Sequence, residues 1–238
     1  DVEVFEQFPY DYTSYSKRQH RWIRGDWQIA SWILPRVPAA TGPGYAPNPL
    51  RPIDRWKILD NLRRSLAPAA CLLLLVFSWT CYTAPGAAST LVALSLVISV
   101  PFQFLDRLIA RWRGDGRGWR EANSDLNRAI VRTALLPHQA YLCADAIVRA
   151  LYRLGFSKRH LLEWQTAEMS DQSARLFLDP YRAQFIIIYA ISGAFSLALQ
   201  FRGSFWEPAW APFLALWIAA PAVQHWIRSQ RSALRKAE

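Results

Sequence analysis

The chain has 238 residues, a formal net charge of +10 and 12 tryptophans, but only 19% of its residues are charged. A soluble domain averages about 25% charged residues, so this sequence is poor in charge and still strongly basic. That balance argues against a disordered chain and against an ordinary acidic cytosolic enzyme. Three cysteines are too few for a disulfide scaffold, and they lack the spacing of metal ligands. The chain starts at Asp1 without Met or a signal-peptide pattern, and we interpret it as a piece of a longer polypeptide.

In the segment Ser16–Leu34, basic residues are interleaved with tryptophans (SKRQHRWIRGDWQIASWIL). One interpretation is an amphipathic interfacial helix with Trp anchors and snorkelling basic side chains. The other is a site for a sugar nucleotide, because indole stacks on apolar faces and the planar guanidinium binds phosphate oxygens in pairs. Asp26 lies four residues after Trp22, so the two share a helical face. The candidate substrate-binding residues are Arg18, Arg21, Trp22, Arg24 and Asp26.

The next two segments differ in regularity. Residues 35–52 are rich in Pro and Gly (PRVPAATGPGYAPNPLRP), which predicts a surface loop without regular structure. Asp54–Arg64 carries Trp56, Leu59 and Leu62 at near-helical spacing, which predicts an amphipathic helix that leads into an apolar run.

Four apolar runs contain no Asp, Glu, Lys or Arg, and each is 18 or 19 residues long: Leu66–Thr83, Ala87–Leu105, Ala183–Phe201 and Ala209–Ile227. A bilayer core of about 30 Å needs roughly 20 helical residues. The runs are therefore predicted transmembrane helices, and the alternative is buried core helices of a soluble protein.

The distribution of charge predicts the topology. Two hairpins with their bases on one side place 27 of the 28 Lys and Arg residues on that side. Positive charge stays cytoplasmic, so both ends and the middle segment are predicted to be cytoplasmic. Trp206, Trp210 and Trp226 flank the last runs, either as an aromatic belt or as packed side chains.

Between the hairpins, Ala129–Leu154 is basic and amphipathic, and Pro137 divides it into two predicted helices. We interpret it as an interfacial segment, with a helix packed on another cytoplasmic domain as the alternative.

Several strings resemble a known family. Arg18-Gln19-His20-Arg21-Trp22 resembles the Q-x-x-R-W motif of processive, membrane-embedded glycosyltransferases of the cellulose synthase type. The strings HRWIRGDWQ, ASWILPRVP and RWKILDNLRRSL resemble cyclic β-1,2-glucan synthases, as does LLEWQTAE at Leu161–Glu168. There is one departure, because the motif register places its Gln at position 18, where this chain has Arg18.

The resemblance implies a glucosyltransferase that uses UDP-glucose and a divalent metal, Mg²⁺ or Mn²⁺, to extend a β-1,2-glucan that the full-length protein cyclises. Trp22 would stack on the acceptor glucose, and Arg21 would hold the diphosphate leaving group. Arg18 would lie near the same pyrophosphate, while Arg24 and Asp26 belong to the same string without an assigned role. The implied partners are UDP-glucose, the growing glucan, the bilayer of a bacterial inner membrane, and upstream and downstream domains of the same polypeptide.

No catalytic residue or metal ligand is assigned in this chain. The acids Asp1, Glu3, Glu6 and Asp11 form no Asp-x-Asp pair, so the general base and the metal ligands are expected before Asp1. We therefore expect the isolated chain to be inactive. A non-catalytic membrane anchor or scaffold is the alternative function. Nucleic-acid binding is not expected, because orientation accounts for charge that flanks membrane spans.

The predicted fold class is all-α, an integral membrane protein with four transmembrane helices in two hairpins plus amphipathic interfacial helices. The predicted divisions are the end of a glycosyltransferase domain (1–65), transmembrane hairpin 1 (66–105), a cytoplasmic amphipathic region (106–182), transmembrane hairpin 2 (183–227) and a basic cytoplasmic tail (228–238).

Overall fold

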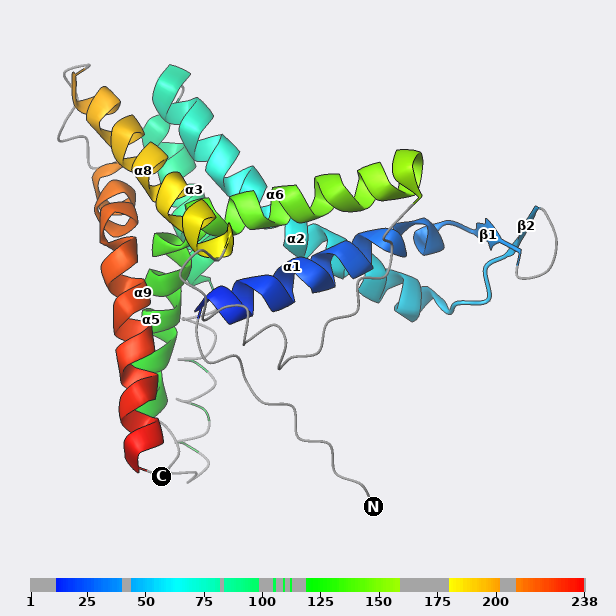
Figure 1. Ribbon diagram of the computed structural model, residues 1–238, viewed down its shortest axis with the longest axis horizontal. Helices are drawn as coiled ribbons and strands as arrows, with labels where there is room; N and C mark the ends of the chain where they lie inside the picture. The colour runs from blue at the N-terminus through cyan, green and yellow to red at the C-terminus, as the bar shows by residue number, and fades with distance from the viewer. Residues whose placement is uncertain are drawn as a thin grey trace. The chain divides into compact units, whose positions relative to one another are not determined.

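A computed structural model describes residues 12–39, 44–81, 84–98, 119–158, 180–201 and 209–237, together with residues 105, 109 and 112. Within these ranges the chain is almost entirely helical (Figure 1), so the all-α class is confirmed in its coarse form. The α-helices are α1 (Tyr12–Gln28), α2 (Pro52–Cys81), α3 (Pro85–Val97), α5 (Trp119–Ala134), α6 (Leu136–Tyr152), α8 (Pro180–Phe201) and α9 (Ala211–Ala237). A 3-10 turn, η1 (Ala30–Ile33), follows α1, and a π-helical turn, η2 (Arg153–Ser157), follows α6.

The prediction of an irregular loop over residues 35–52 is wrong in part. Strands β1 (Arg36–Pro38) and β2 (Tyr45–Pro47) pair antiparallel, with Val37 opposite Ala46. Proline is tolerated here because a two-stranded sheet has only edge strands, so a missing N–H can face solvent. Val37 is 3% exposed and anchors the hairpin, while Gly44 has a φ of +134° that L-residues rarely adopt.

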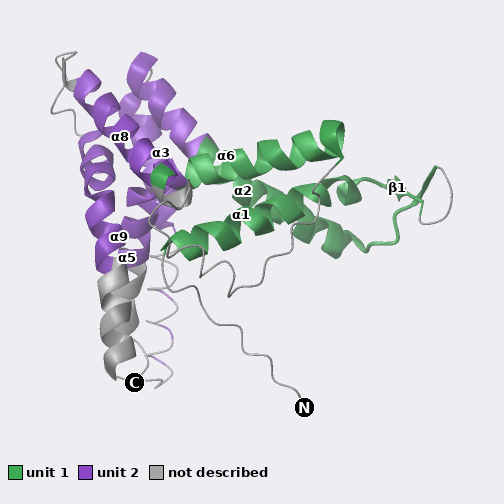
Figure 2. Ribbon diagram, in the orientation of Figure 1, with its two compact units in different colours: residues 1–69, 139–183, 231–238 green, residues 70–138, 184–230 purple. Residues whose placement is uncertain are grey.

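The chain forms two compact units, which Figure 2 colours separately. Unit 1 comprises residues 1–69, 139–183 and 231–238, and unit 2 comprises residues 70–138 and 184–230. Four helices have residues in both units: α2 crosses the boundary after Ala69, α6 after His138, α8 after Ala183 and α9 after Gln230. Each unit therefore combines segments that are far apart in the sequence.

Helix α2 joins a polar half to an apolar half without interruption over 30 residues. Pro52 occupies the first helical position, where its missing N–H costs nothing, and Asp54 places negative charge in the first turn. Pro68 lies inside the helix, close to the point where charged residues give way to apolar ones. The expected amphipathic helix over Asp54–Arg64 that leads into the first apolar run is confirmed.

Within the described residues, fewer helices meet the criteria for crossing a membrane than the four that the sequence predicts. Among the described residues, α2 is the one helix both long and apolar enough to cross a membrane, by length and composition. Helix α3 and Ala183–Leu199 of α8 are apolar but shorter. The four-helix, two-hairpin topology is not confirmed by these lengths and stays a prediction.

Aromatic side chains form the core of unit 2. Trp79 of α2 is fully buried, and its ring centroid lies 5.6 Å from that of Trp217 and 5.8 Å from that of Phe213, both on α9. The Trp79 indole donates a hydrogen bond to Ser89 Oγ of α3 at 2.9 Å. Trp210 is 1% exposed, and its ring centroid lies 6.3 Å from that of Trp79. Of the two alternatives for this residue, the structure therefore favours a packed side chain over a member of an aromatic belt.

The helices α5 and α6 meet at Leu135, two residues before Pro137, so the predicted division into two helices is confirmed. The buried face of α6 includes Leu142, Cys143, Ala146 and Ala150. Cys143 and Ala146 pack against Ile23 of α1. This face of the predicted interfacial segment is therefore covered by protein, while Val148, Tyr152 and Phe156 beyond it are exposed.

Several sequence predictions lie outside the described residues. These are the acids Asp1, Glu3, Glu6 and Asp11, the string Leu161–Glu168, and Trp206.

Candidate functional site

All five candidate residues lie on α1 in unit 1. The buried side of α1 carries Tyr12, Ser16, His20 and Ile23, which recur every three or four residues as one face of a helix requires. Ser16 donates a hydrogen bond to the Tyr12 carbonyl at 2.8 Å, which satisfies its hydroxyl within the helix. Lys17 is also buried, whereas the arginines of α1 are only partly buried and Trp22 is exposed.

Trp22 is the most exposed of the five candidates. Trp22 is 60% exposed, and the Arg18 guanidinium carbon lies 5.8 Å from the centroid of its ring. That distance is within the range of a cation–π contact, and four residues is the spacing that brings helical side chains together. The structure thus brings together two of the predicted residues, an aromatic platform and a cation.

Asp26 shares the helical face predicted for it, but it also contacts a neighbouring helix. Asn61 of α2 donates a hydrogen bond from Nδ2 to Asp26 Oδ1 at 3.1 Å. Burial raises the pKa of Asp26, and the hydrogen bond from Asn61 opposes that rise only in part. Asp26 therefore joins α1 to α2, a role that the sequence alone does not indicate.

Arg21 and Arg24 are partly buried on α1, three residues apart and thus on neighbouring positions of its surface. Arg24 contributes a positive charge that acts on the adjacent His20. Their predicted roles at a diphosphate stay predictions.

A hydrogen-bonded pair next to the candidate residues was missed by sequence reasoning. His20 is 5% exposed, and its Nε2 lies 2.8 Å from Asp145 Oδ2 of α6, 125 residues away. Arg149 Nε donates a second hydrogen bond to the same oxygen at 2.7 Å. The Asp145–Arg149 spacing of four residues is a recognisable helical ion pair, but nothing in the sequence connects it to His20.

The electrostatics of this pair are consistent with a neutral histidine and an ionised aspartate. Burial lowers the pKa of His20, and the hydrogen bond with Asp145 offsets only part of that effect. Burial alone would raise the pKa of Asp145, but the hydrogen bonds from Arg149 and His20 outweigh it and bring this pKa below its ordinary value. Because a carboxylate can only accept, His20 Nε2–H is the donor.

Two further hydrogen bonds fasten α1. Trp27 Nε1 donates to Ser65 Oγ of α2 at 2.9 Å, and Gln139 Nε2 of α6 donates to the Tyr12 hydroxyl at 3.0 Å. The Tyr12–Gln139 and His20–Asp145 contacts advance in the same direction along both helices, so α1 and α6 run parallel. The helix that carries Trp22 is thus held by both of its neighbours in unit 1.

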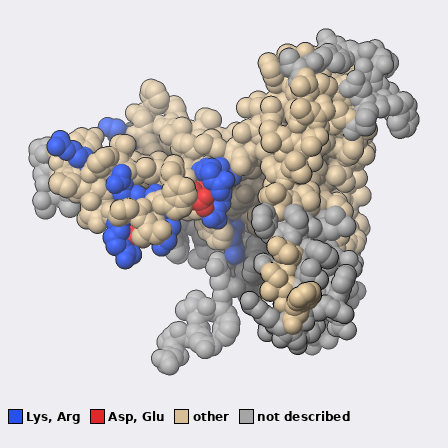
Figure 3. All heavy atoms as spheres, turned by 180° about the vertical axis from the view of Figure 1, so that it is seen from behind, with Lys and Arg blue, Asp and Glu red and all other residues tan. Residues whose placement is uncertain are grey.

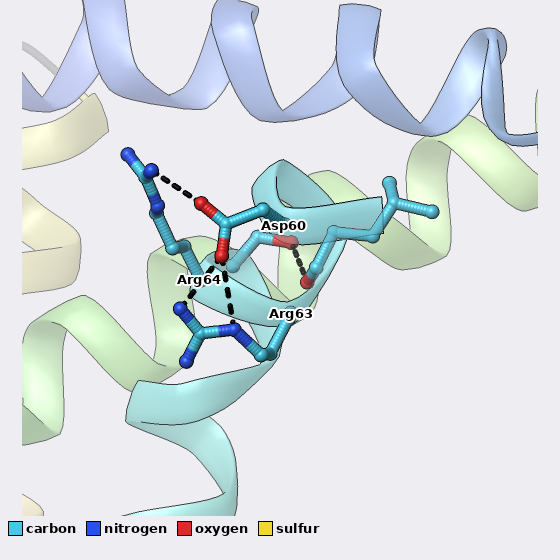
Figure 4. Close-up of polar contacts among 5 residues, drawn as sticks. Asp60, Arg63 and Arg64 are labelled. Carbon is cyan, nitrogen blue, oxygen red and sulfur yellow. Dashed lines mark hydrogen bonds and ion pairs between the residues drawn. The ribbon is translucent and has the colours of Figure 1, made fainter. Parts of the chain in front are cut away.

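Unit 1 is also strongly basic. Among its residues with described side chains there are thirteen Lys and Arg against four Asp, and Figure 3 shows basic side chains gathered on one of its faces. Part of this charge is paired, because Arg63 and Arg64 both reach back to Asp60 (Figure 4). The Arg63 bond measures 2.7 Å. The charge before the first apolar run is therefore a partly neutralised cluster rather than a row of isolated cations.

The described residues do not supply a metal site. No group of three or more His, Cys, Asp or Glu side chains within them is placed to hold a metal ion. The expected Mg²⁺ or Mn²⁺ does not fit this part of the chain, and the position of its ligands stays a prediction.

No family model matches the chain. The chain is, however, 33% identical over 247 residues to the cyclic β-(1,2)-glucan synthase NdvB of Rhizobium meliloti. The resemblance to cyclic β-1,2-glucan synthases is thereby confirmed. The alignment includes 97% of this chain but only 8% of NdvB, so the chain corresponds to a short segment of a much longer protein. At that coverage the similarity to NdvB extends over residues of both units, and it includes polar α1 as well as the apolar helices.

Proposed function

We propose that this chain is part of a membrane-associated glucosyltransferase that builds a cyclic β-1,2-glucan from UDP-glucose. The observation that carries the proposal is the similarity to NdvB along 97% of the chain. In this proposal unit 1 is the end of the glycosyltransferase domain, and the apolar helices anchor it in a bacterial inner membrane with both ends cytoplasmic. The apolar half of α2 supports membrane association.

Within unit 1, Trp22 is the platform for the acceptor sugar. Its exposure supports this role, because an indole face in solvent can receive the CH face of a sugar ring. Arg18 lies against the same ring and brings a positive charge to the platform. Arg21, the next residue before Trp22, holds the diphosphate leaving group together with Arg18, because guanidinium binds phosphate oxygens bidentately. Arg24 and Asp26 complete the candidate set.

The general base and the divalent metal of the full enzyme come from residues outside this chain. The isolated chain is therefore inactive, and glucose transfer from UDP-glucose by these 238 residues alone would contradict the proposal.

The experiment substitutes Trp22→Ala in the full-length parent and measures glucan formed from UDP-glucose in membranes. We expect synthesis to be abolished while the amount of protein in the membrane fraction is unchanged. Trp56→Ala is the matched control, because Trp56 of α2 is also 60% exposed. Full synthesis by Trp22→Ala would overturn the platform role and favour the second candidate function, a non-catalytic membrane anchor.

The diphosphate role of Arg21 has its own test. Arg21→Lys keeps the charge and removes the planar fork. We expect the KM for UDP-glucose to rise, and an unchanged KM would remove Arg21 from the diphosphate.

A further inference from the structure

We infer that His20 and Asp145 are positioning residues that fix the rotation of α1 about its own axis, so that Trp22 faces the acceptor glucan. The inference rests on the proposed function, since it assigns a task to the contact between α1 and α6 at the candidate site. The observation that carries it is the hydrogen bond between buried His20, two residues before the exposed Trp22, and half-buried Asp145.

The geometry of a helix links the two positions. At 3.6 residues per turn, residues two apart point roughly 200° away from each other. His20 is 5% exposed and directed at α6, whereas Trp22 is 60% exposed. A helix that kept the His20–Asp145 bond therefore has to present Trp22 on the side away from α6.

Hydrophobic packing alone would hold this orientation less firmly. The apolar contacts between α1 and α6 involve Ile23 against Cys143, Ala146 and Ile147, with Trp27 at the edge. Such contacts are non-directional, and small residues such as Ala146 let a neighbouring helix turn or slide. A hydrogen bond of 2.8 Å between a buried ring nitrogen and a carboxylate tolerates little rotation.

Arg149 completes the arrangement on α6. It donates to the same Asp145 oxygen at 2.7 Å and so holds the carboxylate in the direction of His20. The charged groups that face His20 are Asp145 and Arg149 of α6 and Arg24 of α1 itself.

The test compares variants of the full-length parent with a soluble β-1,2-glucan oligosaccharide as acceptor. We expect His20→Ala and Asp145→Ala each to raise the KM for the acceptor by about tenfold or more, as expected for the loss of a hydrogen bond to a charged group. The KM for UDP-glucose should change by less than about twofold, because only the acceptor platform has turned. The double variant should be no worse than either single variant, since both remove one interaction.

Two variants separate positioning from general destabilisation. His20→Gln keeps a side-chain N–H donor of similar reach and should restore most of the acceptor affinity. Tyr12→Phe removes another hydrogen bond between the same two helices, the one from Gln139, at a point two turns from His20, and should leave the acceptor KM near the parent value. Resistance of each variant to trypsin in membranes establishes that it is folded.

The outcomes are distinct. An unchanged acceptor KM in folded His20→Ala would overturn the inference. So would a result in which His20→Ala and Tyr12→Phe both raise the KM for the acceptor and the KM for UDP-glucose by the same factor. If Trp22→Ala abolishes synthesis while His20→Ala is normal, only the positioning role fails. If Trp22→Ala itself is normal, the proposed function fails, and the positioning role fails with it.

Discussion

The two units differ in the surroundings of the tryptophan side chains that link their helices. In unit 1, tryptophan and aspartate link helices through side-chain hydrogen bonds, as Trp27 with Ser65 and Asp26 with Asn61 do. In unit 2, indole and phenol groups fill the core and donate to a hydroxyl or to backbone carbonyls, as Trp217 does to Thr133 O at 3.1 Å and Tyr189 does to Ala134 O at 2.7 Å. Both units therefore use directional bonds between helices, but in unit 2 the donors are aromatic rings that also fill the core, so the stability of unit 2 depends more on packed volume.

The largest expected loss of stability comes from a substitution that disrupts the packing of unit 2. Trp79→Ala removes a fully buried indole that touches three aromatic rings and should lower the free energy of unfolding by about 3–5 kcal/mol. Thermal unfolding of the chain in detergent, followed by circular dichroism, measures the change. Trp22→Ala is the matched control, and its cost should not exceed about 1 kcal/mol because the residue is exposed and loses only a contact with Arg18. Equal losses of unfolding free energy in Trp79→Ala and Trp22→Ala would show that burial does not distinguish the two tryptophans.

Acidification should affect the directional bonds of unit 1. Burial lowers the pKa of His20, so between that pKa and about 6.5 the unfolded chain binds more protons than the folded one. Stability from this group is complete above about pH 6.5 and falls as the pH drops, by at most about 1.4 kcal/mol per pH unit.

The pH experiment compares melting temperatures from pH 5 to pH 8 in the parent and in His20→Gln. Burial also lowers the pKa of His138 to about 4, so a residual slope should survive the substitution. A slope that is identical in both proteins would show that His20 does not titrate on unfolding.

A smaller effect should follow from Ser65→Ala. The substitution leaves the Trp27 indole N–H without its partner on α2 and should cost about 1 kcal/mol. Ser95→Ala is the control, because Ser95 of α3 is exposed, donates to Val92 O within its own helix, and otherwise has a long 3.9 Å contact with Cys71 Sγ of α2. A cost at Ser95 equal to that at Ser65 would mean that the bond to Trp27 adds nothing.

The smallest effect is expected at Asp60. Arg63 and then Arg64 hold the pKa of Asp60 below its ordinary value, but both arginine side chains are exposed to solvent, where salt screens their charge. Asp60→Asn should leave the melting temperature unchanged, whereas Asp145→Asn, which alters the buried contact with His20, should lower it. A clear loss at Asp60 would place exposed ion pairs among the bonds that specify unit 1.

Local patterns predicted the helices well. The amphipathic Asp54–Arg64 and the division at Pro137 were visible because helical periodicity and proline act on neighbouring residues. The β1–β2 hairpin was not visible, since six prolines in residues 35–52 outweighed the one buried anchor, Val37. The four apolar runs predict four spans, and the described residues support one of them by length and composition, so the other three stay predictions.

The candidate site was predictable only along α1. The spacing of Trp22 and Asp26 placed these two on a common face, and the structure adds a contact between Arg18 and Trp22 that was not predicted. The partners of α1 were not predictable, because Asn61, Gln139 and Asp145 meet it through tertiary packing. No periodic signal relates His20 to a residue 125 positions later.

That separation also has a consequence in time. A ribosome adding about 5–20 residues per second needs roughly 6–25 s to pass from His20 to Asp145. For most of that interval α1 has been made, α2, α3 and α5 are being synthesised, and Asp145 of α6 is still missing. The His20–Asp145 bond is therefore among the late contacts of biosynthesis, and it forms only after the first apolar helices have been made.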